Sequence, residues 1–279
     1  MAFKDILLTL TSYPEPTPVS VVEEAISIAA TLEAHLAALS CEVRVQLPGH
    51  FLSGSVANIP GIIAGEAEKS RKSASGLLAT FDAVAEKAGV THEVIVEKCL
   101  TFEVPELVVD YARLRDLTIV PVPESYDQWY AEAVIFGSGR PTLILPETPR
   151  ARPFELGTVV VAWDFSRAAA RAVSDALPLL ERAKKVRVVT VSNEKVLDTK
   201  HSAEELAKNL VRHGIDVVLD GIDADGRRIG EVLEAYALSH EADILVMGAY
   251  GHARWREFIL GGATKSLLSR PPLPILLSH

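Results

Sequence analysis

The two halves of this sequence follow the same order of apolar runs and helical segments, and this repetition constrains the fold more than any other feature. Short apolar runs predict five strands in the first half, over residues 6–10, 38–45, 92–99, 117–122 and 142–145. Helical periodicity predicts helices between them, over residues 19–36, 66–87, 104–114 and 131–136. Alternating strands and helices require a parallel sheet with helices on both faces.

The second half repeats this order. Strands are predicted over residues 159–163, 186–191, 215–219, 243–247 and 274–277. Helices are predicted over residues 166–183, 202–213 and 228–240, with a last helix starting near residue 265. Ser166 is a predicted N-cap, and Ser202 with Glu205 has the spacing of a capping box. The run that begins at Asp116 corresponds to the run that begins at Asp243, which indicates an internal duplication.

We therefore predict an α/β protein with two repeated doubly wound domains, over residues 1–149 and 150–279. Each domain is expected to contain a five-stranded parallel sheet with helices on both faces. The short apolar last strands of the two halves would lie at sheet edges, where unpaired backbone groups need cover. We expect the halves to pair through these strands as an intrachain pseudo-dimer, and a homodimer is also compatible with the sequence.

Composition excludes several classes of partner. The net charge of −9 argues against nucleic acid, which requires a basic face. No apolar run is long enough to span a membrane, and the first residues lack the layout of a signal peptide, so a cytoplasmic location is expected. Cys41 and Cys99 both fall on predicted strands and are expected to be buried free thiols, with a disulfide as the less favoured alternative.

A glycine-rich stretch follows the strand at 243–247. Gly248 and Gly251 come first, and Gly261 and Gly262 follow at the start of a predicted helix. Glycines let a ligand approach the backbone closely, and a helix N-terminus presents free N–H groups with a positive dipole. Thr264 adds a hydroxyl donor in the first turn. This pattern predicts a phosphate-binding site, although a glycine-rich connection without a ligand remains the alternative.

The spacing of these glycines resembles that of ATP-binding members of the universal stress protein family, which carry Gly-x-x-Gly, nine residues, and then Gly-Ser/Thr. Gly248, Gly251 and Gly261 match this pattern, whereas Gly262 stands where serine or threonine is usual. The resemblance covers nearly the whole chain as a tandem arrangement and is specific in the second half. It implies the adenine-nucleotide alpha-hydrolase-like fold and binding of ATP or AMP, with or without Mg²⁺.

The resemblance also implies a set of contact residues. Ligands of open α/β sheets bind beyond the carboxyl ends of the strands, where Asp164 and Gly248 should face each other. In the family the matching aspartate lies beside the ribose, and Val191 is placed to meet the adenine. The full implied set is Ala162, Asp164, Val191, Met247, Gly248, Gly251, His252, Gly261, Gly262, Ala263 and Thr264.

Some of these residues have simpler explanations. Asp164 could cap a loop, and His252 could belong to an exposed basic loop.

Gly248→Val or Gly261→Val is expected to abolish nucleotide binding and leave the fold largely intact.

The first half lacks the features of the predicted site. Thr11 replaces the aspartate, and the run Pro121-Val122-Pro123 stands where the glycines should be. Prolines remove N–H donors, and Glu124 would repel phosphate. We therefore expect one nucleotide per chain, in the second half. The nearby aromatic residues, Tyr130 among them, could form a ligand surface, a partner surface or core.

Two functions fit these observations. The first is a nucleotide-binding protein of stress response or regulation, with at most slow ATP hydrolysis because no catalytic constellation is present. The second is a scaffold or interaction module of the same fold that has no nucleotide, which Gly262 favours. No metal site is predicted, because no histidine pair has metal-ligand spacing with a third ligand nearby.

Overall fold

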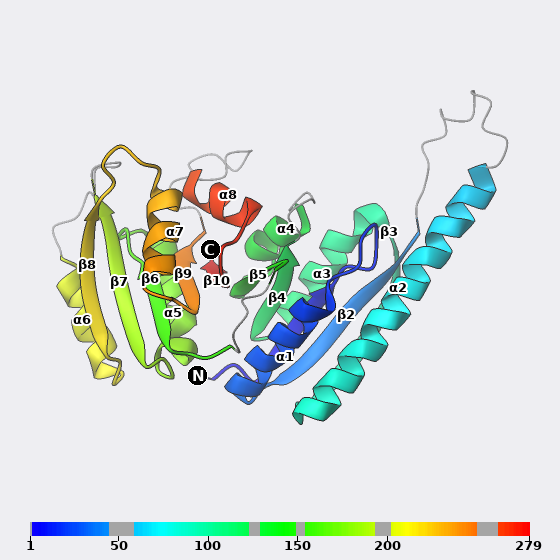
Figure 1. Ribbon diagram of the computed structural model, residues 1–279, viewed down its shortest axis with the longest axis horizontal. Coiled ribbons are helices and arrows are strands. Elements are labelled where there is room, and N and C mark those ends of the chain that lie inside the picture. The colour runs from blue at the N-terminus through cyan, green and yellow to red at the C-terminus, as the bar shows by residue number, and fades with distance from the viewer. Residues whose placement is uncertain (1, 45–58, 123–128, 149–153, 193–201, 250–261) are drawn as a thin grey trace.

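The computed structural model describes residues 2–44, 59–122, 129–148, 154–192, 202–249 and 262–279 (Figure 1). These residues form a ten-stranded sheet in the order β3-β2-β1-β4-β5-β10-β9-β6-β7-β8. Each half contributes five neighbouring strands that run parallel to one another. The predicted fold class is confirmed, with two doubly wound units joined in one continuous sheet.

The strands and helices of the two halves occur in the same order. The strands of the first half are β1 Asp5–Leu10, β2 His35–Arg44, β3 His92–Leu100, β4 Leu117–Val122 and β5 Thr142–Pro146. Its helices are α1 Val19–Leu32, α2 Ile59–Ala88, α3 Val104–Arg113 and α4 Trp129–Gly137, with a 3-10 turn at Thr101–Glu103. The strands of the second half are β6 Thr158–Ala162, β7 Lys185–Ser192, β8 Val217–Asp223, β9 Ile244–Gly248 and β10 Ile275–Ser278. Its helices are α5 Arg167–Leu180, α6 Ala203–Arg212, α7 Ile229–Ser239 and α8 Gly262–Ser269.

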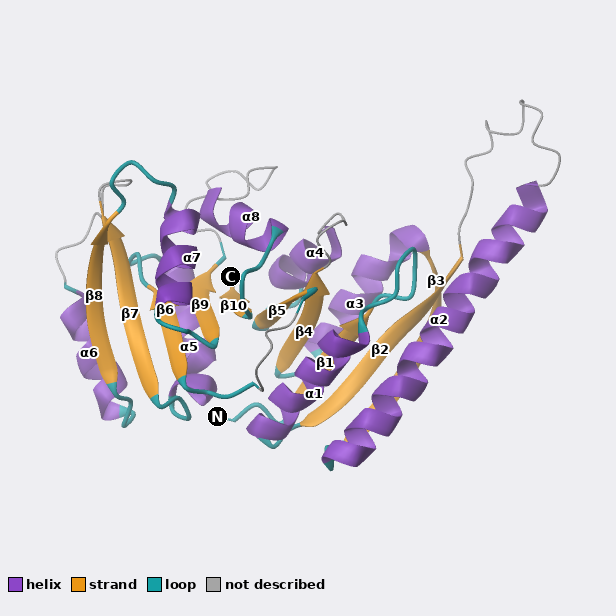
Figure 2. Cartoon of the chain, viewed as in Figure 1, coloured by secondary structure: helices purple, strands orange, loops and turns teal. Residues whose placement is uncertain are grey.

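The halves meet at the middle of the sheet, where β5 and β10 pair antiparallel (Figure 2). Leu276 lies opposite Leu143, and Ile275 lies opposite Ile144. The predicted intrachain pseudo-dimer through the last strands is therefore confirmed. Each of these strands covers the edge that the other would expose to solvent.

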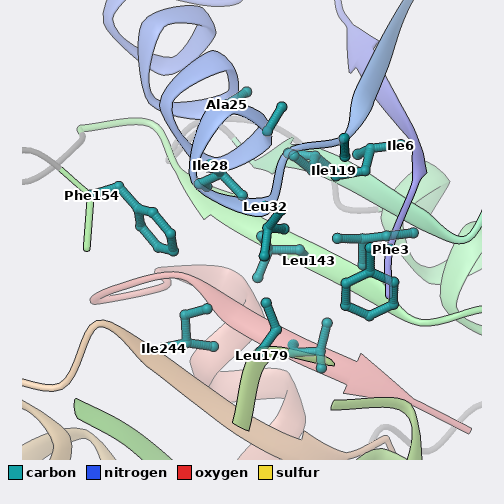
Figure 3. Packing of buried hydrophobic residues seen from close by; sticks show 14 of the residues in the cluster. Phe3, Ile6, Ala25, Ile28, Leu32, Ile119, Leu143, Phe154, Leu179 and Ile244 are labelled. Carbon is teal, nitrogen blue, oxygen red and sulfur yellow. The ribbon is translucent and has the colours of Figure 1, made fainter. Parts of the chain in front are cut away.

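Two hydrophobic clusters cover the two faces of the sheet. Side chains of α1, α2, α5 and α6 belong to the first cluster, and those of α3, α4, α7 and α8 belong to the second. Figure 3 shows Leu32 and Leu143 from the first half packed in the same cluster as Leu179 and Ile244 from the second. The core is therefore continuous across the junction between the halves.

The duplication extends to single side chains. The Asp116 carboxylate accepts hydrogen bonds from the backbone N–H groups of Lys4 and Asp5, at 2.9 and 3.1 Å. Asp243 accepts the same pair of bonds from Gly157 and Thr158, both at 2.9 Å. In each half, one aspartate just before the fourth strand holds the start of the first strand.

Several predicted boundaries were wrong. The helix expected over 19–36 ends at Leu32, because Glu33 adopts a left-handed conformation with φ 54° and β2 begins at His35. The helix expected over 66–87 begins at Ile59, so the stretch around Gly65 is helical. The strand expected over 215–219 spans Val217–Asp223 and passes through Gly221.

The two predicted caps had different outcomes. Ser166 is confirmed as the N-cap of α5, since its hydroxyl accepts a bond from the Ala169 N–H at 3.1 Å. Ser202 makes no side-chain capping bond at the start of α6. The Glu205 carboxylate instead accepts a bond from Lys208 at 2.7 Å. The capping box predicted there was therefore wrong.

Candidate functional site

Three parallel strands of the second half end close together and position the residues implied by sequence. Val161 of β6 pairs with Val246 of β9, so Ala162 and Met247 lie one position beyond that pair, side by side. On the other side of β6, Ala162 pairs with Val189 of β7. The carboxyl ends of β6, β7 and β9 therefore lie side by side and form one edge of the sheet. This is the edge at which ligands of open α/β sheets bind.

Asp164 follows β6 at this edge and is partly exposed. Its Oδ1 accepts a hydrogen bond from the backbone N–H of Ser166 at 3.0 Å, which shapes the loop leading into α5. The side chain therefore caps the loop, as the simpler explanation predicted. A carboxylate can accept several hydrogen bonds, so loop capping by itself does not exclude a ligand contact.

Gly248 ends β9 and packs against the first turn of α5. A Cβ atom at Gly248 would lie 2.5 Å from the Ala168 carbonyl carbon and 2.5 Å from the Ala169 nitrogen. These are backbone atoms that cannot move aside as a flexible side chain could. The expectation that Gly248→Val would leave the fold largely intact was therefore wrong, because a larger residue would push α5 off the end of β9.

Half-buried apolar side chains form a surface beside Asp164. Val191 of β7 lies opposite Ile222 of β8, and both pack on the second hydrophobic cluster together with Ala162 and Ile229. A flat aromatic ring could pack on this surface. Sequence analysis missed Ile222 because Asp220-Gly221 is typical of a turn and placed the strand end too early. It missed Ile229 because this residue lies on a helix at the edge of the site.

The helix α8 begins at Gly262, so its N-terminus belongs to the second half, like the strand ends described above. Ala263 is half-buried, and Thr264 is only 4% exposed. A Cβ atom at Gly230 of α7 would lie 3.3 Å from the backbone of Ala263, so this glycine lets α7 and α8 pack closely. Free N–H groups in a first helical turn suit an anion.

The predicted residues therefore divide into two groups. The structure brings the ends of β6, β7 and β9 together at one edge, with Ala162, Asp164, Val191, Met247 and Gly248. Gly262, Ala263 and Thr264 are placed on the first turn of α8. Gly251, His252 and Gly261 lie outside the described residues.

The corresponding edge of the first half differs in chemistry. Thr11 follows β1 where Asp164 follows β6, and β4 continues through Pro121 and Val122. Glu124 lies outside the described residues.

Among the side chains that the structure describes in either half, no group of three His, Cys, Asp or Glu could hold a metal ion. In the same described residues, every helix is too short or too polar to cross a membrane.

Comparison with known proteins found a family model that matches the second half of the chain. Residues 155–279 match the model of the universal stress protein family. No curated protein matches the sequence.

The fold of the whole chain is similar to solved structures. One is a universal stress protein from Archaeoglobus fulgidus DSM 4304, with a TM-score of 0.75 and 17% identity, covering 100% of this chain and 97% of that chain. Another is named as a universal stress protein from Pseudomonas aeruginosa UCBPP-PA14, with a TM-score of 0.57 and 14% identity, covering 99% and 93%. A third, a protein of unknown function from Pseudomonas aeruginosa PAO1, has a TM-score of 0.58 and 13% identity, covering 98% and 92%. These identities are low, so the likeness concerns the fold.

Proposed function

We propose that residues 155–279, which match the model of the universal stress protein family, bind one adenine nucleotide per chain, ATP or AMP, with or without Mg²⁺. The site proposed is the edge formed by the carboxyl ends of β6, β7 and β9. The observation that carries the proposal is that Asp164 follows β6 and Gly248 ends the neighbouring β9, beside an apolar surface. A nucleotide needs these features together, because it has a ring, a polar sugar and an anionic tail.

Each part of the ligand has a matching group. The apolar surface of Val191 and Ile222 suits the adenine ring. The Asp164 carboxylate can accept a hydrogen bond from a ribose hydroxyl while it still caps the loop. The first turn of α8, with Gly262 at its start, offers N–H groups for phosphate. Gly251, His252 and Gly261 are proposed to complete the phosphate contacts.

The proposed role is regulatory, in stress response or a related process, with at most slow hydrolysis of ATP. Among the residues that the structure describes, Asp164 is the one candidate base at this edge, and it already shapes the loop. A scaffold or interaction module without nucleotide is the second candidate. Gly262 favours it, because glycine has no hydroxyl where the family pattern has one.

Nucleotide binding should be visible as thermal stabilisation. At about 100 times its Kd, ATP should stabilise the native protein by roughly 2.7 kcal/mol. For a chain of this length, that corresponds to a rise in Tm of about 5–10 °C. Calorimetric titration should give one site per chain. If ATP, ADP and AMP at millimolar concentration all leave Tm unchanged, with and without Mg²⁺, the scaffold function replaces the nucleotide proposal.

Asp164→Asn separates a ligand contact from loop capping. The amide oxygen of asparagine can still accept the Ser166 N–H, so the loop should keep its shape. Nucleotide affinity should fall about fivefold, as expected for one hydrogen bond. Asp223→Asn is the matched control, because Asp223 accepts the Asp225 N–H at 2.9 Å in the same way from the outermost strand of this half. Equal losses in the two variants would show that Asp164 does not contact the nucleotide.

A further inference from the structure

A cavity of about 50 Å³ opens in the first half, at the carboxyl ends of β1 and β2 and beside α3. Its floor is buried, and its rim is half-buried. The buried lining residues are Thr9, Leu10, Ser12, Leu39, Cys41, Val43, Val108 and Tyr130. The rim residues are Thr11, Tyr13, Thr101 and Val104.

This cavity occupies the position that the proposed nucleotide site has in the second half. The pairs Asp5↔His35 and Thr158↔Lys185 start the corresponding strand pairs of the two halves. Counting along the strands from these pairs places Thr11 where the second half has Asp164, and Cys41 where it has Val191. The first half therefore keeps an opening at this position, lined by residues of different chemistry.

The twelve lining residues that the structure describes are all uncharged, so none of them offers a cation to a phosphate or a carboxylate. Burial raises the pKa of the Cys41 thiol, and Cys99 and the Glu97 carboxylate raise it further. Burial and the carboxylates of Glu103 and Glu97 likewise raise the pKa of Cys99. These shifts show that the surroundings oppose negative charge, which an anionic ligand would add.

The polar groups of the cavity divide into two sets. The buried hydroxyls donate to the wall itself: Thr9 to the Ile119 carbonyl at 3.3 Å, and Tyr130 to the Pro121 carbonyl at 3.0 Å. At the rim, the hydroxyls of Thr11 and Thr101 make no side-chain hydrogen bond to the rest of the described chain. These two hydroxyls can therefore meet a polar atom of a ligand, above an apolar floor.

We propose that this cavity binds a small uncharged molecule with a short apolar chain and one hydroxyl or carbonyl group. Leu39, Val43 and Val108 contact the apolar part, and the Thr11 and Thr101 hydroxyls bond its polar atom. The site is separate from the proposed nucleotide site and does not depend on it. The two halves then bind ligands of opposite character on one duplicated framework.

1-Propanol is a suitable probe, with propionate as an analogue that carries a negative charge on a similar body. Titration of the full chain, followed by amide chemical shifts, should give shifts around Thr11, Cys41 and Val43 with 1-propanol. Propionate should bind at least tenfold more weakly, because the described lining holds no cation and the surroundings that raise the pKa of Cys41 oppose a carboxylate. Equal binding of propionate, or shifts confined to other parts of the chain, would overturn the proposal.

Substitutions at two rim positions test the contacts. Thr11→Val removes the hydroxyl at nearly constant shape and should weaken 1-propanol binding about fivefold, whereas Thr11→Ser should restore the affinity. Thr101→Phe should fill the opening and abolish binding. Thr31→Val is the matched control. Thr31 lies in the last turn of α1, just before β2 begins, at the opposite end of the strands from the cavity. Its hydroxyl donates to the Ser27 carbonyl.

Thermal denaturation of each variant verifies folding. If Thr101→Phe does not fold, the comparison of Thr11→Val with Thr11→Ser decides alone. Unchanged affinity in Thr11→Val together with normal folding would refute the proposed contact. The nucleotide experiment is independent, since neither Thr11 nor Thr101 belongs to that site.

Discussion

At the scale of single residues, Gly248 matters both for the proposed ligand site and for the packing of α5. It ends a strand at the proposed ligand edge, and it lets the first turn of α5 approach within 2.5 Å of where a Cβ would lie. Gly248→Ala should lower the free energy of unfolding by about 1–3 kcal/mol, as overpacking against backbone does. Urea denaturation at neutral pH measures this change.

Gly76→Ala is the matched control for this substitution. Gly76 lies within α2, and nothing lies within 4 Å of where its Cβ would be. Alanine there should raise the free energy of unfolding by about 0.4–1 kcal/mol, because it restricts the unfolded chain and favours the helix. Equal and small effects at the two positions would contradict the packing role given to Gly248.

A half-buried polar cluster in the second half makes stability depend on pH. Tyr236 of α7 donates to the Asp220 carboxylate, which also accepts from Arg187 at 2.8 Å. Burial alone raises the pKa of Asp220, but the bonds from Tyr236 and Arg187 outweigh burial, so the pKa is lowered. Burial and the hydrogen bond to Asp220 raise the pKa of Tyr236 to about 12.

Both shifts favour the folded state at neutral pH. The lowered pKa of Asp220 contributes stability that is present above its unfolded value, 3.8, and is lost as pH falls through the folded value. The raised pKa of Tyr236 contributes stability that is present below 10.0 and is lost as pH rises toward about 12.

Tyr236→Phe should therefore cost about 2 kcal/mol at pH 7, and this cost should shrink between pH 10 and 12. Urea denaturation at a series of pH values measures it. Tyr111→Phe, which removes a more exposed bond to Glu97 in the first half, should cost less at pH 7. A cost for Tyr236→Phe that stays constant up to pH 12 would contradict this account.

At the scale of elements, α5 and α6 show that the same residue type can cap one helix and fail to cap another. Ser166 accepts the Ala169 N–H at the start of α5, whereas Ser202 makes no such bond at the start of α6. Ser166→Ala should therefore cost about 1 kcal/mol, and Ser202→Ala should cost much less. Denaturation midpoints of the two variants, compared with the wild type, measure the difference. Equal costs would mean that local propensity rather than the capping bond sets the effect.

At the scale of the whole molecule, the β5–β10 pairing makes the two halves one cooperative unit. Leu143 and Leu276 lie opposite each other and are fully buried in a cluster that both halves share. Leu143→Ala should lower the free energy of unfolding by about 2–5 kcal/mol, through lost burial and the cavity it leaves. Because the core is continuous, calorimetry should show one transition that moves as a whole.

Leu210→Ala tests this cooperativity from the far side of the second half. Leu210 on α6 is fully buried but lies away from the junction. Its replacement should shift the same single transition that Leu143→Ala shifts. Two transitions, each moved by one of the variants alone, would show that the halves unfold independently.

The sequence by itself determined the order of elements, the duplication and the parallel sheets. These follow from apolar periodicity, which is a local property and survives without knowledge of the fold. The pairing of the halves was also predictable, because short apolar edge strands such as β5 and β10 need cover. The candidate Gly248 came from a local motif whose spacing is visible in the sequence alone, and Asp164 came from its place after a predicted strand together with the family resemblance.

The tertiary structure decided what local signals leave open. The end of α1 depends on a left-handed Glu33, and the extent of β8 depends on pairing with β7 across a turn-like Asp220-Gly221. The packing role of Gly248 and the cavity beside Thr11 depend on residues far apart in the chain. Contacts between distant segments have no local periodicity, so only the folded chain shows which side chains share a surface.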